Sequence, residues 1–242
     1  LVAVLTTVAE MQALQGIQGA ILIGVGLLVG GTIGYIVAVK VEMTNMPEMV
    51  ALFNGFGGAA SALVAFSESW RFIENPALPI PTGLALYVLV IATGLSGFVG
   101  WMTLTGSLLA MLKLKGGIQI FGRWIRTPTW GPAWLNPIKM LLGLSVSLLI
   151  ALSTGAPTNV DYIIAALIVS CILGLLLVLP IGGADMPVVV SLLNALSGIA
   201  AAFTGFIILN SVLIIAGSLV GASGLILTVI MCKAMNRSLY EV

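Results

Sequence analysis

The sequence predicts an all-α protein, specifically a polytopic transmembrane helix bundle. Of the 242 residues, 60% are hydrophobic and only 7% are charged, and the mean hydropathy is +1.21. A soluble domain carries about 25% charged residues, so a chain this poor in charge could not cover a water-exposed surface. The composition therefore excludes an ordinary soluble protein, a disordered chain and a nucleic-acid-binding protein.

Uninterrupted apolar stretches give the expected helices in order along the chain. About 20 apolar residues cross a hydrocarbon core of about 30 Å, which leaves room for seven or eight spans. Residues 1–9 are expected to be the end of a partial helix, and 83–112 is long enough to be tilted. Pro47, Pro137 and Pro187 stand where a first helical turn tolerates proline. The seven full spans are expected at 18–39, 47–66, 83–112, 137–154, 161–179, 187–208 and 211–233.

Basic residues sort to one side if these spans alternate in direction. Eight of the nine Lys and Arg residues then fall on one side of the membrane, and Arg71 falls on the other. Because cytoplasmic loops carry the excess of Lys and Arg, this side and the C-terminus are expected in the cytoplasm or the mitochondrial matrix. The membrane would be a bacterial or mitochondrial inner membrane. The eight residues are Lys40, Lys113, Lys115, Arg123, Arg126, Lys139, Lys233 and Arg237.

The residue types that are missing narrow the possible chemistry. The chain has no histidine, which excludes a His-ligated metal, a Ser-His-Asp triad and a histidine proton relay. Cys171 and Cys232 lie inside apolar runs without metal or redox spacing. We therefore expect no catalytic residue, no bound metal and no bound cofactor within this chain.

An internal repeat appears when the sequence is shifted by 140 residues. Met46–Asn54 then aligns with Met186–Asn194, and Gly58 aligns with Gly198. The repeat predicts two parallel copies of three helices, residues 18–112 and 161–233. Parallel halves of this kind commonly enclose a conduit.

Each copy carries an asparagine seven residues after the proline that opens its helix. Asn54 follows Pro47, and Asn194 follows Pro187. At 1.5 Å per residue, both amides lie about 10 Å into the membrane, where they need hydrogen-bond partners. One interpretation is interhelical hydrogen bonding, worth about 1 kcal/mol or less per residue. The other is a water-lined proton path with both amides at one axis.

Small and hydroxylic residues accompany these asparagines. Gly58 and Gly198 are expected to allow close helix packing, as is Gly224 in the last span. Ser223 and Thr228 of that span lie at near-helical spacing. Packing explains their small size, but a file of water molecules facing the second asparagine would also use their hydroxyls.

Two acidic residues lie at the expected cytoplasmic edge. Glu48 lies in the first turn of one Met-Pro helix, and Asp185 directly precedes the other. Asp185 is well placed to cap its helix. Alternatively, an acid at the mouth of a polar file receives protons or pairs with a partner surface.

Four polar segments resemble one known family. They include the strings Gly-Gly-Ala-Asp-Met-Pro and Cys-Lys-Ala-Met-Asn-Arg-Ser, which are unusual among apolar helices. Together the segments closely resemble the membrane domain of the β subunit of proton-translocating NAD(P)+ transhydrogenase, and the resemblance runs from end to end. The segments are 41–54, 104–108, 181–191 and 231–238.

The resemblance implies a component of an enzyme that passes hydride between NAD(H) and NADP(H) while protons cross the membrane. The nucleotides would bind to soluble domains outside this chain, with the NADP(H)-binding domain following its C-terminus. The implied partners are the α-subunit membrane helices, the NAD(H)-binding domain, the lipid bilayer and a second copy of the complete assembly. No nucleic-acid partner is expected.

The resemblance also implies roles for individual residues. Asn54 and Asn194 fall on the proton-path positions of the family, which often has histidine at the first. Because an amide does not titrate near neutral pH, the proton would pass on ordered water or use a group from the α subunit. The other matched positions are Glu48 at the cytoplasmic mouth, Ser223 and Gly224 in the packed last helix, and Asp185, Lys233 and Arg237 near the NADP(H)-binding domain.

Two functions of other classes stay open from the sequence. A stand-alone small-solute transporter with parallel repeats would take up solute without nucleotides. A structural membrane anchor would pack both asparagines dry against neighbouring helices, and their substitution would alter assembly but not proton flux.

Overall fold

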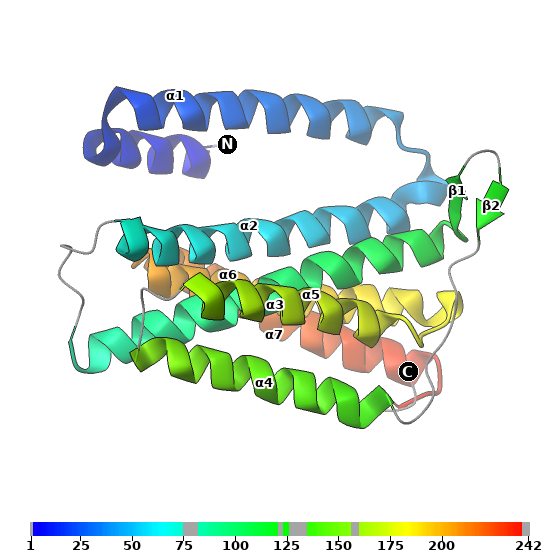
Figure 1. The fold of residues 1–242 in the computed structure, drawn as a ribbon. Coiled ribbons are helices and arrows are strands. Elements are labelled where there is room, and N and C mark those ends of the chain that lie inside the picture. Colours follow the sequence, from blue (N-terminus) through cyan, green and yellow to red (C-terminus); the bar gives the residue numbers. More distant parts are fainter. Residues whose placement is uncertain (1, 75–81, 121–122, 126–134, 156–159, 239–242) are drawn as a thin grey trace. The chain divides into compact units, whose positions relative to one another are not determined.

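A computed structural model describes residues 2–74, 82–120, 123–125, 135–155 and 160–238 (Figure 1). The described residues are almost all helical, which confirms the all-α prediction. Two compact units divide the chain, Leu1–Met46 and Pro47–Val242. The helices are α1 (Val2–Lys40), α2 (Met46–Glu74), α3 (Leu84–Leu114), α4 (Leu135–Gly155), α5 (Val160–Val178), α6 (Met186–Ile207) and α7 (Ser211–Ala234).

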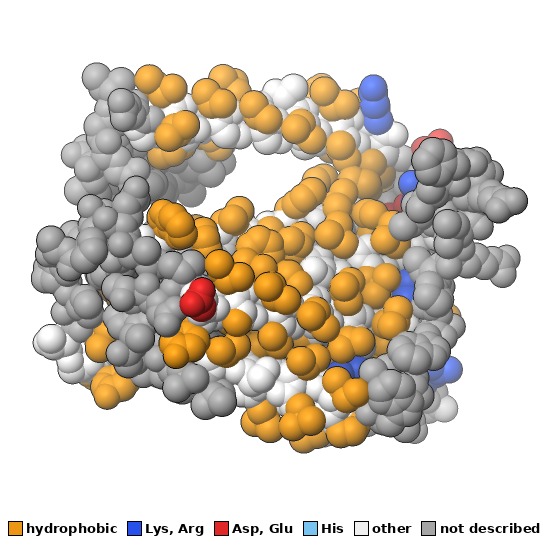
Figure 2. Space-filling model, in the orientation of Figure 1, with side chains coloured by type: hydrophobic (Ala, Val, Ile, Leu, Met, Phe, Trp, Pro, Cys, Tyr) orange, Lys and Arg blue, Asp and Glu red, His pale blue; other side chains and the backbone are white. Residues whose placement is uncertain are grey.

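Five of the described helical segments are long and apolar enough to cross a membrane: Ile21–Lys40, Met43–Arg71, Leu84–Leu114, Gly183–Ile207 and Ser211–Ala234. Hydrophobic side chains cover most of the helical surface displayed in Figure 2. The apolar segment Ile164–Val178 of α5 is shorter. An integral membrane protein follows from these helices, whereas the count of seven full spans stays a prediction.

The first unit consists of α1 and a short 3₁₀ turn. The helix runs from Val2 to Lys40, so the residues predicted as a partial helix and as a separate span belong to one helix. The prediction ended the first segment because Glu10, Gln12 and Gln15 interrupt the apolar run. Polar residues limit membrane depth, but they are good helix formers and do not end a helix.

α2 and α6 begin in the same way. A 3₁₀ turn precedes each helix, Met43–Asn45 before α2 and Gly183–Asp185 before α6. The residues before these turns are extended, with φ and ψ of −73° and 151° at Glu42 and −74° and 158° at Gly182. The repeated Met-Pro sequence therefore has the same local backbone path in both places.

α3 ends at two glycines and leads into a short hairpin that the sequence did not predict. Gly116 and Gly117 have φ of +80° and +139°, which residues with a Cβ rarely adopt. The strands β1 (Ile118–Ile120) and β2 (Arg123–Ile125) then pair antiparallel, with Gln119 opposite Trp124. Periodicity missed these strands because three residues are too few to show alternation.

Glycines set the closest helix approaches in the second unit. A Cβ on Gly100 of α3 would lie 2.5 Å from the Gly58 carbonyl oxygen of α2, and one on Gly217 of α7 would lie 2.7 Å from that of Gly198 in α6. A Cβ on Gly174 of α5 would overlap the Met102 carbonyl oxygen of α3. Any larger residue at these positions would push the helices apart.

A tight turn joins α6 to α7. Leu209 takes the left-handed conformation with φ +54°, and the side chain of Asn210 caps α7 by accepting a hydrogen bond from the Leu213 amide at 3.0 Å. A Cβ on Gly205 would lie 2.7 Å from the Ile214 backbone nitrogen, so the two helices are in contact from the turn onward. α6 and α7 therefore form a closely packed antiparallel hairpin.

Candidate functional site

Buried hydroxyl groups line one face of α3, the helix that packs against both α5 and α6. Ser96, Thr103 and Ser107 are fully buried, at spacings of seven and four residues. These spacings place all three on the same side of a helix. Ser107 and Thr103 are about 6 Å apart along the helix axis, and Ser107 and Ser96 about 16 Å. The face gives α3 a polar side within an otherwise apolar span.

Asn54 connects three helices at one end of this face. Its Nδ2 donates a hydrogen bond to Ser107 Oγ of α3 at 3.1 Å, and its Oδ1 accepts one from Ser197 Oγ of α6 at 2.7 Å. Ser197 Oγ also lies 2.8 Å from the backbone oxygen of Asn194, so its single proton can bond either acceptor. We call Asn54, Ser107 and Ser197 the Asn54 junction.

Asn194 has a different environment from Asn54. Its side chain is exposed, and its amide has no hydrogen-bond partner among the described residues. The next residue, Ala195, faces Gly224 of α7, where an added Cβ would lie 2.9 Å from Ala195 Cα. On α2, the corresponding neighbour of Asn54 is Gly55, which faces the Cβ of Ser107. The backbone oxygen of Asn194 thus contacts Ser197 of the Asn54 junction, but the side-chain amide of Asn194 does not.

A second buried cluster lies further along α3. Ser96 Oγ is 2.8 Å from Thr204 Oγ1 and 3.2 Å from the backbone oxygens of Ser61 and Ala200. Thr204 Oγ1 in turn donates to the Ala200 carbonyl at 3.0 Å. Hydroxyl and carbonyl groups of α2, α3 and α6 therefore meet here as well.

Thr103 lies between these clusters on α3. Its Oγ1 is buried and has no hydrogen-bond partner within the described part of the chain. An added Cβ on Gly58 would lie 2.9 Å from Thr103 Cβ, so α2 packs closely over it. An unsatisfied buried hydroxyl costs about 1–3 kcal/mol of folding free energy. Thr103 is therefore the position of the α3 face where a hydrogen-bond partner is missing among the described residues.

Of the predicted path residues on α7, one is buried and one is exposed. Thr228 Oγ1 is buried, 2.8 Å from the Gly224 carbonyl oxygen and 3.1 Å from Ser191 Oγ of α6. Ser223 is exposed and bonds only the Val220 carbonyl of its own helix, at 3.1 Å. The buried one, Thr228, therefore links α7 to α6.

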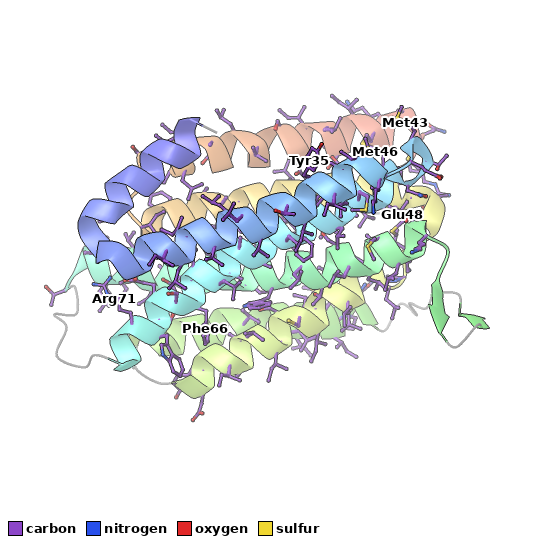
Figure 3. All side chains as sticks on the ribbon, turned by 90° about the horizontal axis from the view of Figure 1, so that it is seen from above. Tyr35, Met43, Met46, Glu48, Phe66 and Arg71 are labelled. Atoms are coloured by element: carbon purple, nitrogen blue, oxygen red, sulfur yellow. The ribbon has the colours of Figure 1, made fainter. Side chains whose placement is uncertain are left out.

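The predicted mouth residues divide in a similar way. Arg237 donates a hydrogen bond to Asp185 Oδ2 at 2.8 Å in an ion pair, and the Asp185 side chain is 14% exposed. Asp185 makes no capping hydrogen bond to α6, so it serves the ion pair instead. Lys233 is exposed. Glu48 is half-buried near the start of α2, and Arg71 lies near the opposite end of that helix (Figure 3).

Lys113 is a buried cation that sequence reasoning treated only as a marker of the membrane side. Its side chain is 6% exposed, and its Nζ donates hydrogen bonds to the backbone oxygens of Val178 at 3.0 Å, Ile181 at 2.7 Å and Leu179. It therefore joins the end of α3 to the end of α5. Hydropathy counting could not find this contact, because the partners are main-chain atoms of another helix.

Sequence reasoning also did not assign the hydroxyls of the α3 face or their partners on α6. The available signal was the seven- and eleven-residue spacing of Ser96, Thr103 and Ser107, which repeats on one side of a helix. Hydroxyl and amide groups both donate and accept hydrogen bonds, so together they can support a chain of them. No cluster of possible metal ligands occurs among the described residues.

Comparison with known proteins gives consistent results. A family model for the NAD(P) transhydrogenase beta subunit matches residues 1–242. The chain is 38% identical over 242 residues to a protein named NAD(P) transhydrogenase subunit beta from Rhodospirillum rubrum. It is equally similar to the protein of that name from the strain ATCC 11170. The match covers 100% of this chain but 49% of each relative, so the chain spans about half of their length.

Proposed function

Since the chain belongs to the NAD(P) transhydrogenase beta subunit family, we propose that it is the membrane domain that conducts protons in such an enzyme. In the complete enzyme, proton movement would be coupled to hydride transfer between NAD(H) and NADP(H). Both nucleotides would bind to domains outside these residues. The α-subunit membrane helices would be its partners in a dimeric assembly, in a bacterial or mitochondrial inner membrane.

The Asn54 junction is the observation that carries this proposal. It places an amide and two hydroxyls from three different helices within hydrogen-bond distance, inside segments apolar enough to span a membrane. Burying polar groups inside a membrane costs free energy, so polar groups found there commonly belong to a functional site. The buried hydroxyls of α3 extend the polar groups away from the junction toward Ser96.

Protons would move along this polar face by exchange between hydrogen-bonded groups. Each hydroxyl can accept a proton on its oxygen while releasing its own, and the amide of Asn54 can orient a neighbouring hydroxyl or water molecule. Because Ser96 and Ser107 are about 16 Å apart along α3, water molecules would have to complete the path. The unpartnered hydroxyl of Thr103 supports a water position between them.

The internal repeat belongs to the same proposal. The aligned residues Gly58 and Gly198 make similar close contacts, Gly58 with Gly100 of α3 and Gly198 with Gly217 of α7, which supports the repeat. The two Met-Pro helix starts share their preceding 3₁₀ turn. Three-helix copies over 18–112 and 161–233, with seven spans in all, would give parallel halves around a path, as in other repeat transporters.

The Asp185–Arg237 ion pair at the start of α6 would control the path. Asp185 and Arg237 precede α6 and follow α7, next to where the NADP(H)-binding domain would continue. Binding of NADP(H) would change contacts at Asp185, Lys233 and Arg237 and so shift the balance between two states of the path. A difference of a few kcal/mol suffices for such a shift.

Substitution of Ser107 tests the proposal in the complete enzyme reconstituted in vesicles. Ser107→Ala removes one hydroxyl from the junction, and proton pumping and coupled hydride transfer should fall together, at least about tenfold for a barrier raised by 1.4 kcal/mol. Ser145→Ala is the matched control, because Ser145 on α4 bonds only Leu142 of its own helix. Unchanged pumping with weakened assembly would favour a structural anchor, and nucleotide-independent solute uptake would favour a transporter.

A further inference from the structure

The ammonium group of Lys113 is bonded entirely by main-chain oxygens. Val178, Leu179 and Ile181 supply three acceptors, which matches the three donors of a lysine. The two ion pairs found among the described residues are Arg71–Glu68 and Arg237–Asp185, and neither involves Lys113. A buried charge without a carboxylate partner needs such complete hydrogen bonding to be tolerated.

The sequence explains why carbonyls are available at this place. Pro180 cannot continue α5, so the last carbonyls of that helix lack intrahelical partners. The C-terminus of a helix also carries a partial negative charge, which favours a cation. Lys113 therefore caps α5 from the end of α3.

The same lysine also holds the connection that follows α5. Ile181 precedes Gly182, whose carbonyl oxygen accepts a hydrogen bond from the Asp185 amide at 3.1 Å. Met186, the next residue, is fully buried in a cluster with Ala110 of α3. The turn that carries Asp185 is thus held by α3 on both sides.

We infer that Lys113 is a positioning residue for the Asp185–Arg237 ion pair. It fixes residues 179–185 to α3, so that the carboxylate of Asp185 meets Arg237 at a place set by the helix that also carries Ser107. Lys113 and Ser107 are six residues apart, about 9 Å along that helix. This inference rests on the proposed function, because it gives a mechanical link between the ion pair and the Asn54 junction.

A three-residue mutant cycle in the complete enzyme tests this role. The rate of coupled hydride transfer is measured for Asp185→Asn, Arg237→Gln and both together. Because contacting groups are non-additive, the product of the single effects should differ from the double effect by at least about threefold. In a Lys113→Gln background the difference should disappear. Lys115→Gln is the matched control, since Lys115 is exposed and two residues away.

Hydrogen exchange of the purified enzyme gives a readout independent of proton conduction. In Lys113→Gln, the amides of 181–186 should exchange at least about tenfold faster, because local opening becomes easier. Lys113→Arg, which keeps the charge but presents a planar fork, should have an intermediate effect and covers the case in which Lys113→Gln does not assemble. Native exchange and intact non-additivity in these variants would overturn the inference, whereas unaltered pumping in Ser107→Ala would overturn only the proposed function.

Discussion

Asn54 and Asn194 occupy the same place in the repeated sequence but have different neighbours. Asn54 faces a serine on α3 and a serine on α6, and it bonds both. Asn194 has an exposed side chain with no hydrogen-bond partner among the described residues, and its neighbour Ala195 is the residue that faces Gly224 on α7. The difference lies in the side chains that surround each amide: Asn54 has two serine partners, and Asn194 has none among the described residues. The repeated motif therefore sets the position of the amide along its helix. The neighbouring side chains determine whether that amide is hydrogen-bonded or exposed.

The largest effects on stability are expected at the glycine contacts of the two helix pairs. The contact of α2 with α3 at Gly100 closely resembles the contact of α6 with α7 at Gly217. Gly100→Ala and Gly217→Ala each place a Cβ within 2.5 Å of a backbone atom of the facing helix. Overpacking of this kind costs about 1–3 kcal/mol, so both variants should lower the midpoint of thermal unfolding in mild detergent by similar amounts. Gly57→Ala is the control, because nothing lies within 4 Å of its added Cβ. A loss in only one variant would break the equivalence of the two helix pairs.

Leucine at each asparagine sharpens the comparison, because it separates stability from conduction. Asn54→Leu removes two interhelical hydrogen bonds and should cost about 1 kcal/mol in stability. Asn194→Leu loses no hydrogen bond within the described residues, so stability should stay within about 0.5 kcal/mol. Both should suppress proton pumping and coupled hydride transfer in reconstituted vesicles. If Asn194→Leu pumps normally, its open amide does not belong to the path.

The smallest effect should come from exchanging the neighbours themselves. Gly224→Ser alone forces a side chain against Ala195, whereas Ala195→Gly with Gly224→Ser copies the arrangement of Gly55 and Ser107. The double variant should be more stable than the sum of the single changes predicts, by about 0.5–1 kcal/mol in unfolding free energy. Strict additivity would mean that the Cβ of Ala195 is not what excludes a serine at position 224.

Much of the helical layout was predictable, because apolar runs bounded by proline and charge mark membrane segments. The last two spans were predicted at 187–208 and 211–233, and the helices are Met186–Ile207 and Ser211–Ala234. Hydropathy cannot show that residues 10–17 stay helical, since it reports depth and not hydrogen bonding. The hairpin of β1 and β2 was too short to predict.

The site was less predictable than the fold, because it depends on the register between helices. The sequence singled out Asn54 and placed Asp185 and Arg237 at one end, but it could not pair Asn54 with Ser107 and Ser197. Lys113 was used only to assign the membrane side, because its partners are carbonyl oxygens, which every residue has. Expected symmetry suggested that both amides reach one axis, whereas the side chain of Asn194 is exposed and makes no hydrogen bond to the junction.

The hairpin of α6 and α7 is closed at both ends by different means. At one end, the chain itself makes the turn at Leu209 and Asn210, and at the other the Asp185–Arg237 ion pair joins the free ends. One closure is covalent, and the other responds to salt and to any competing charge. Loss of the ion pair should therefore loosen the connection between the start of α6 and the end of α7, while the turn at Leu209 and Asn210 keeps the two helices in register.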